Sequence, residues 1–379
     1  MSDIQSVLDK AVAAQDVPFV VGMVGNADGI TFSGAAGDAA QGLTAAEDTG
    51  FRIFSMTKAI GSLAAMILID RGKMSLDTPV GDVLPAWNDL KVLEGFDGDT
   101  PILRAPKTVA TARHLATHTS GMEYEFWNPD VPKYMQLTGH PSVLSGLVQS
   151  LNYPLTTDPG TRWGYGPSID WLGRMVEEVD GRRIDAFCAA EIFEPLGMTD
   201  TAFEPDALSD RLCTVRMRGE DGGFGPFDLA PPPHPEVYGM GHALYSTAPD
   251  YMRFLRMVLN RGQLDGTRIL SEEAFDVMLR DQMNGLHFEN MHSVAPPVSA
   301  DVELPPGSTH SFISVRTESD IPGKRSAGTQ SWAGVCNTHY WVNPAKDVAA
   351  VIMTQSLPFG EPRFMQTYDA YERAVYAAL

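Results

Sequence analysis

The chain has 379 residues, of which 44% are hydrophobic and 20% charged, a balance typical of a globular protein that buries a large core. The formal net charge of −20 argues against a nucleic-acid partner and against an anionic membrane surface, because both require a basic face on the protein.

The three cysteines, Cys188, Cys213 and Cys336, are an odd number, lie far apart and form no metal-ligand pattern. We expect reduced thiols in a cytoplasmic protein. The first residues lack the basic and apolar regions of a secretory signal. No stretch reaches the ~20 apolar residues of a membrane-spanning helix. The sequence therefore predicts no membrane segment, no metal and no cofactor.

The N-terminal part predicts a helix followed by an antiparallel hairpin. Apolar residues recur at helical spacing over residues 4–15. A β-rich run at 18–25 is separated from a second run at 30–35 by the turn sequence Asn-Ala-Asp-Gly. A further short strand is expected at 51–54.

A helix buried on all sides is expected from Ser55 to Ile69, with Lys58 as its only charged residue. Ser55 and Lys58 lie three positions apart, so they share one helix face and can share a proton. Burial disfavours the charged ammonium, which would make the lysine amine a proton acceptor. The same residues also fit a helix cap and a lysine that extends to the surface. The Ser-x-x-Lys pattern alone therefore does not distinguish a catalytic role from a structural one.

The middle of the chain predicts loops to residue 106 and then a short helix at 111–122. His114 and His118 lie four apart, but the pattern His-Glu-x-x-His is absent, which favours hydrogen-bonded structural roles over metal ligation. Tyr165 lies in a Gly/Pro-rich turn before a predicted helix at 169–179. It serves there either as an anchor or as a proton carrier beside a cation.

The C-terminal part returns to strands. Residues 332–342 and 348–354 predict two strands joined by a turn, before a last helix at 364–378. Strands at both chain ends around a helix-rich middle predict an α+β fold with one antiparallel sheet built from the two ends and flanked by helices. We assign residues 1–80 and 236–379 to the sheet domain, and residues 81–235 to a mainly helical domain with long loops.

Several segments occur in the order that characterises the serine β-lactamase and penicillin-binding-protein superfamily. They are SMTK at 55–58, KMSLDTPV at 73–80, HLATHTSG at 114–121, PLGMTDT at 195–201 and LYSTAPDY at 244–251. Over nearly its whole length the chain resembles the family VIII carboxylesterases, which are similar to class C β-lactamases. The resemblance implies a β-lactamase/DD-peptidase-like fold.

The resemblance also implies roles for individual residues. Ser55 would be the nucleophile and Lys58 its proton-sharing partner. Tyr165, in the second motif, would act as general base and then as general acid. The implied mechanism passes through an acyl-enzyme, from which an alcohol leaves before water attacks.

The third motif would be Trp332 to Gly334, the Trp-x-Gly form of the esterases in place of the Lys-Thr-Gly of β-lactamases. By that match Trp332 and Gly334 border the substrate. The N–H groups of Ser55 and Val335 would then form the oxyanion hole.

Two departures from the β-lactamase pattern bear on the substrate. Pro167 replaces an asparagine that orients an amide, and Trp332 replaces a lysine that attracts a carboxylate. Both changes favour neutral esters of small acyl groups. Tyr124, Phe126 and Trp127 are candidates to line the pocket with Trp332, although core packing or a lid would use the same aromatic residues.

We therefore expect a serine carboxylesterase that hydrolyses short-chain esters through an acyl-enzyme on Ser55. Its partner would be a small ester, with no nucleic acid and no membrane, and the oligomeric state stays open. The alternatives are a β-lactamase, D-amino-acid peptidase or amidase, or an acyltransferase of the same fold. A silent scaffold is disfavoured because it has no use for Lys58 in an apolar helix. No Gly-x-Ser-x-Gly occurs, so the nucleophile elbow of α/β-hydrolases is excluded.

Overall fold

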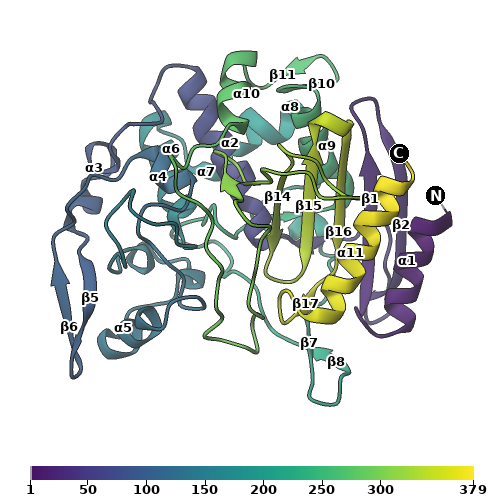
Figure 1. Ribbon diagram of the computed structural model, residues 1–379, viewed down its shortest axis with the longest axis horizontal. Coiled ribbons are helices and arrows are strands. Elements are labelled where there is room, and N and C mark those ends of the chain that lie inside the picture. The colour runs from purple at the N-terminus through teal and green to yellow at the C-terminus, as the bar shows by residue number, and fades with distance from the viewer. Residues whose placement is uncertain (1) are drawn as a thin grey trace.

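The computed structural model describes residues 2–379 and confirms the predicted α+β architecture (Figure 1). An eight-stranded sheet lies at its centre, in the order β12-β13-β14-β15-β16-β1-β2-β3. Neighbouring strands are antiparallel, and β1 pairs with both β2 and β16, so the two chain ends build one sheet as expected. The strands are β1 (Phe19–Gly25), β2 (Ile30–Ala40), β3 (Leu43–Thr44), β12 (Thr309–His310), β13 (Val315–Arg316), β14 (Gln330–Gly334), β15 (Thr338–Asn343) and β16 (Val348–Met353).

Successive side chains of β1 point to opposite faces of the sheet. Val20 and Val24 join Trp341 in a core beneath α1 (Ser2–Ala13) and α11 (Pro362–Ala377), which pack side by side (Figure 1). Val21 and Met23 belong to the larger core on the other face, where α9 (Ala248–Leu259) packs against β1 and β16. The sheet is therefore covered by helices on both faces.

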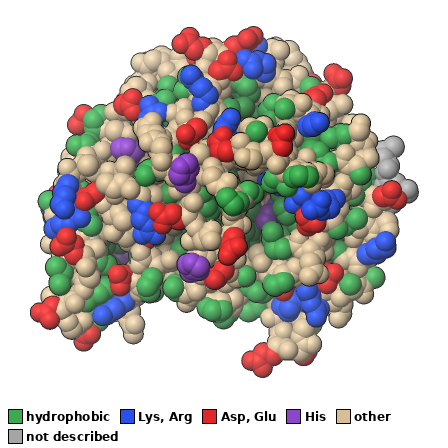
Figure 2. All heavy atoms as spheres, in the orientation of Figure 1, with side chains coloured by type: hydrophobic (Ala, Val, Ile, Leu, Met, Phe, Trp, Pro, Cys, Tyr) green, Lys and Arg blue, Asp and Glu red, His purple; other side chains and the backbone are tan. Residues whose placement is uncertain are grey.

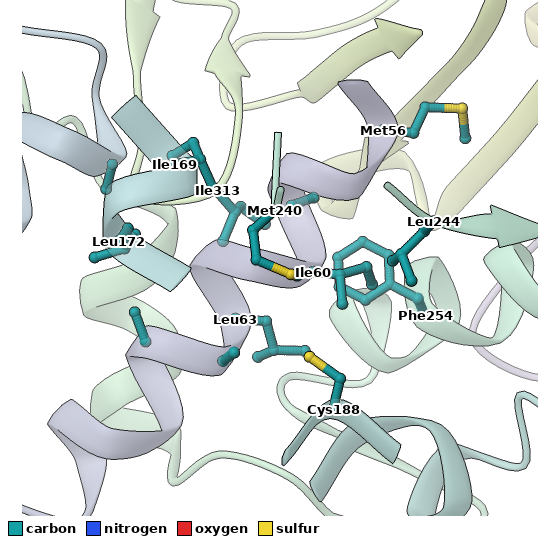
Figure 3. Close-up of a cluster of buried hydrophobic side chains, with 14 of the residues drawn as sticks. Met56, Ile60, Leu63, Ile169, Leu172, Cys188, Met240, Leu244, Phe254 and Ile313 are labelled. Carbon is teal, nitrogen blue, oxygen red and sulfur yellow. The ribbon is translucent and has the colours of Figure 1, made fainter. Parts of the chain in front are cut away.

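The helix α2 (Thr57–Asp70) runs through this larger core, and its residues from Thr57 to Leu68 are all buried. It packs against α6 (Ser168–Asp180). Figure 3 shows Ile60 and Leu63 between side chains of α6 and the side chains of Leu244 and Phe254. Burying an aliphatic side chain of this size stabilises the fold by roughly 1.5–3 kcal/mol. The apolar surroundings explain why an all-round apolar sequence forms this helix.

The remaining helices and strands lie outside the eight-stranded sheet, and some of the loops that connect them line the cavity described below. The helices among them are α3 (Val80–Val83), α4 (Ala112–Ala116), α5 (Asp130–Thr138), α7 (Ile184–Cys188), α8 (Glu194–Leu196) and α10 (Glu272–Leu279). The strands form three pairs, β4 (Phe51–Arg52) with β9 (Tyr245–Ser246), β5 (Val92–Asp97) with β6 (Thr100–Arg104) and β10 (Gln263–Leu264) with β11 (Thr267–Arg268), and one three-stranded sheet of β17 (Ser356–Leu357), β7 (Arg216–Arg218) and β8 (Phe224–Pro226). Within residues 2–379 no helix has the length and apolar character needed to cross a membrane.

Two local predictions are wrong. Residues 332–342 form not one strand but parts of β14 and β15, joined by a turn in which Asn337 adopts a φ of 61°. The turn sequence Val-Cys-Asn contains no glycine or proline, so it resembles a continuing strand. Residues 92–104, expected as loops, form the β5–β6 hairpin. The division into domains at residues 80 and 236 stays a prediction.

Candidate active site

Ser55 lies in a single 3-10 turn, Phe54–Met56, and α2 begins after it at Thr57. The preceding residue, Phe54, has a φ of 41°, in the left-handed region that bulky side chains rarely adopt. Its buried ring packs in a small cluster with Cys336 and Val335, just beyond β14. This packing holds the backbone around Ser55 against the end of β14.

Lys58, in the first turn of α2, is 3% exposed and points at three acceptors. Its Nζ lies 3.1 Å from Ser55 Oγ, 3.1 Å from Tyr124 Oη and 2.8 Å from the carbonyl oxygen of Gly241. An ammonium has three N–H groups, so these partners satisfy it completely. Lys58 therefore does not extend to the surface, and its contact with Ser55 is the one that proton sharing requires.

Tyr165 presents its ring, rather than its hydroxyl group, to the lysine. Lys58 Nζ lies 4.8 Å from the ring centroid, and Tyr165 Oη accepts a hydrogen bond from Trp332 Nε1 at 3.3 Å. Among the hydrogen bonds of residues 2–379, none joins Tyr165 Oη to Ser55 or Lys58. Tyr165 and Ser55 nevertheless line the same cavity.

Tyr124, expected only as a pocket residue, is the phenol that contacts the lysine. Its backbone N–H donates to the carbonyl oxygen of Tyr165 at 2.9 Å, and the two rings meet edge to face with centroids 5.2 Å apart. Burial, and then the nearby charge of Asp170, raise the pKa of Tyr124 well above its usual value.

Asp170 and Gly241 were not singled out in the sequence. Asp170 comes from α6, is 1% exposed, and accepts the Gly241 N–H through Oδ1 at 2.5 Å. It thus fixes the loop whose carbonyl oxygen holds Lys58. One signal was available, because Asp170 is a carboxylate flanked by Ile169, Trp171 and Leu172 in a predicted amphipathic helix.

The backbone N–H groups of Ser55 and Val335 are oriented by the 3-10 turn and by the end of β14, respectively. Both residues line the cavity. Among the backbone hydrogen bonds and side-chain contacts of the described chain, neither N–H has an acceptor. Two free N–H groups at one cavity wall can stabilise a developing oxyanion.

The cavity in front of Ser55 measures about 750 Å³. Tyr124, Phe126, Trp127 and Trp332 line it as predicted, whereas Gly334 does not. Further apolar walls come from Val143, Leu144, Phe227, Leu229, Phe288, Met291 and Val298. Figure 2 shows hydrophobic side chains gathered around a hollow near the middle of the visible face, with acidic and basic groups among them at its edge.

Two cations line the cavity, and both are paired. Lys324 Nζ lies 2.9 Å from carboxylate oxygens of Asp369 and of Glu372, and Arg325 Nε lies 2.7 Å from Glu372. Within residues 2–379 the cavity wall thus offers no unpaired lysine or arginine to an anionic substrate. Histidine adds no charge either, because burial lowers the pKa of His242, which also lines the cavity.

Comparison with known proteins gives matches over nearly the whole chain. The family model described as Beta-lactamase matches residues 4–374. The chain is 28% identical over 402 residues to the ML-236A carboxylate methylbutanoyltransferase of Penicillium citrinum, covering 100% of this chain and 94% of that protein. It is 30% identical over 324 residues to the lovastatin esterase of Penicillium rubens, covering 80% and 78%. Unliganded simvastatin synthase from Aspergillus terreus has a TM-score of 0.84 at 26% identity, covering 99% of this chain and 97% of that one.

Proposed function

The chain belongs to the beta-lactamase family and is an enzyme of the serine acyl-transferring type, and from this we propose that it moves a short acyl group from an ester to the hydroxyl group of a bulky apolar alcohol. The observation that carries the proposal is the apolar cavity of about 750 Å³ at Ser55, which is far larger than a short acyl group needs. The relative from Penicillium citrinum, named as a methylbutanoyltransferase, supports the same reaction type.

In this proposal Ser55 attacks the donor ester and carries the acyl group. Tyr165 takes the serine proton; Lys58 Nζ lies 4.8 Å from the centroid of its ring, and its Oη accepts a hydrogen bond from Trp332 Nε1. The free N–H groups of Ser55 and Val335 bind the oxyanion, the kind of contact that typically contributes about 10²–10³-fold to the rate.

The walls of the cavity favour an apolar alcohol over water as the acceptor of the acyl group. Phe126, Trp127, Phe288 and Met291 offer few partners to an ordered water molecule. An apolar alcohol instead gains about 25 cal/mol for each Å² of apolar surface that it buries there. The absence of an unpaired cation along the wall in residues 2–379 weakens the β-lactamase and peptidase alternatives, whose substrates carry a carboxylate.

Ester hydrolysis is the second candidate. It is supported by the 30% identity to a protein named lovastatin esterase. Chemically it differs only in the acceptor, because water in place of the alcohol attacks the same acyl-enzyme on Ser55. The two functions are therefore distinguished by the fraction of the acyl-enzyme that reacts with the alcohol rather than with water.

The test supplies 4-nitrophenyl butyrate together with a panel of hydrophobic alcohols and measures butyrate ester and free butyrate by mass spectrometry. We expect the new ester to exceed the free acid at millimolar alcohol. Free acid alone with every alcohol would instead establish the hydrolase. Ser55→Ala, checked for folding by circular dichroism, should lose both products, and turnover that persists in it would overturn the acyl-enzyme.

A further inference from the structure

Three polar side-chain atoms converge on Gly241. A Cβ built there would stand 2.8 Å from Asp170 Oδ1, 2.9 Å from Tyr124 Oη and 3.3 Å from Lys58 Nζ. Real Cβ atoms are essentially never closer than 3.0 Å to another heavy atom. Glycine is therefore what permits Lys58 to bond to Tyr124 at 3.1 Å with a buried carboxylate beside them.

The two phenols of the cavity differ in their hydrogen bonds and in their surroundings. Tyr165 Oη accepts the N–H of Trp332 and forms no hydrogen bond with Lys58 Nζ. Tyr124 Oη contacts Lys58 Nζ, and burial, followed by the charge of Asp170, raises the pKa of Tyr124 and keeps its hydroxyl group protonated. When the surroundings of two titratable groups differ in this way, one is suited to act as the base and the other as the acid.

The hydroxyl proton of Tyr124 is also free to reach the cavity. Tyr124 Oη is the acceptor in its bond with Lys58, and in residues 2–379 it donates to no other group. Its side chain lines the cavity together with Ser55. A donor in this position faces the space where the alcohol part of an ester lies.

We propose that the two phenols divide the proton transfers. Tyr165 exchanges a proton with Ser55 Oγ, and Tyr124 exchanges one with the oxygen of the alcohol. This inference rests on the acyl transfer proposed above and adds a catalytic residue to it. It replaces the single tyrosine that acts first as base and then as acid.

The steps balance. In acylation, Ser55 Oγ bonds to the acyl carbon and its proton passes to the Tyr165 phenolate. The ester C–O bond breaks, and the leaving oxygen takes the Tyr124 proton, which the Lys58 ammonium replaces across 3.1 Å. In transfer, the accepting alcohol gives its proton to Tyr124 while Tyr124 returns one to Lys58. Tyr165 then protonates Ser55 Oγ as the acyl bond breaks, and every group regains its starting state.

The test is a series of butyrate esters whose leaving alcohols run from 4-nitrophenol through trifluoroethanol to ethanol. Nitrophenolate leaves without a proton, whereas ethoxide requires one. Loss of the general acid therefore lowers kcat/KM most for the ethyl ester. We compare kcat/KM of the unaltered enzyme, Tyr124→Phe and Tyr165→Phe, each per mole of Ser55 that a fluorophosphonate labels. This normalisation removes any unfolded fraction.

We expect Tyr124→Phe to slow the ethyl ester about 100-fold more than the nitrophenyl ester. Tyr165→Phe should slow both esters equally. Gly241→Ala, which pushes Tyr124 away from Lys58, should reproduce the leaving-group dependence of Tyr124→Phe. Equal losses across the series in Tyr124→Phe and Gly241→Ala would overturn the division of roles. Such a result would leave acyl transfer intact, since that function is tested separately, by the ratio of new ester to free acid and by the loss of turnover in Ser55→Ala.

Discussion

Gly334 packs directly against the carbonyl oxygen of Ile53, and a Cβ at position 334 would stand only 2.3 Å from that oxygen. The end of β14 is thereby held against the residue that precedes the Ser55 turn. The two N–H groups assigned to the oxyanion hole come from distant parts of the chain, and this close approach fixes their separation.

Gly334→Ala should lower kcat/KM for 4-nitrophenyl butyrate about 100-fold, because the added methyl group forces β14 away from Ile53 and separates the two donors. Steady-state kinetics on protein whose melting temperature has been measured gives the value. The matched control is Gly225→Ala, where an added Cβ meets nothing within 4 Å. A loss below threefold at Gly334, or an equal loss at Gly225, would contradict the assignment.

Trp332→Lys should improve the binding of an anionic substrate. The substitution places an unpaired cation on the cavity wall, and a hydrogen bond to a charged group contributes about 1.5–3 kcal/mol. We expect KM for a chromogenic cephalosporin to fall about tenfold while kcat/KM for the neutral ester falls. Trp332→Phe removes the same indole N–H without adding charge, so an equal effect on KM in both variants would refute the explanation.

Leu144→Trp should shift the acyl-enzyme from transfer toward hydrolysis. Leu144 lines the cavity, so a larger side chain there narrows the space for a bulky alcohol but not for water. The ratio of transferred to hydrolysed product should fall about tenfold, equivalent to ~1.4 kcal/mol. Leu147→Trp, at a site that is 39% exposed, is the matched control and should keep the original ratio.

Stability should fall on mild acidification because of buried histidines, among them His310 and His339. Burial lowers the pKa of His310 to about 4 and, with the charge of Arg325 adding to burial, that of His339 to about 3. Between pH 6.5 and 4 the unfolded chain binds protons at these positions that the folded chain does not. The free energy of unfolding therefore decreases as pH falls, by about 1.4 kcal/mol per pH unit for each histidine.

Urea unfolding at pH 7 and pH 5 measures this effect, and His339→Phe isolates the contribution of His339. The His339 ring packs among the rings of Phe359, Phe364 and Tyr368, so a phenyl group suits the site. The variant should lose about 2 kcal/mol less than the parent between the two pH values. An identical loss in both proteins would show that His339 does not titrate on unfolding.

The fold is largely predictable from the sequence because its motifs mark specific local structures in a fixed order. The apolar run after Lys58 is long enough for a helix buried on all sides, and the strand patterns at the two ends leave β1 and β16 as neighbours in one sheet. The reversal at Asn337 was missed because its left-handed residue is an asparagine inside an apolar stretch, a weak turn signal.

The candidate site is predictable in its residues but not in their contacts. The spacing of Ser55 and Lys58 sets their separation through helix geometry, so that relationship follows from the sequence. The choice between two phenols does not, because Tyr124 and Tyr165 lie in loops. Which hydroxyl group meets Lys58 depends on how Trp332 and Asp170 pack around them.

The position of β1 between β2 and β16 has a consequence for how the enzyme is made. During translation, Ser55, Lys58 and both tyrosines are synthesised well before β14 to β16. Until those strands emerge, β1 has an open edge, and Ser55, the proposed nucleophile, lacks the Val335 N–H. We therefore expect the incomplete chain to be inactive toward esters and prone to self-association through the open edge of β1, and we expect activity only after these distant segments have paired.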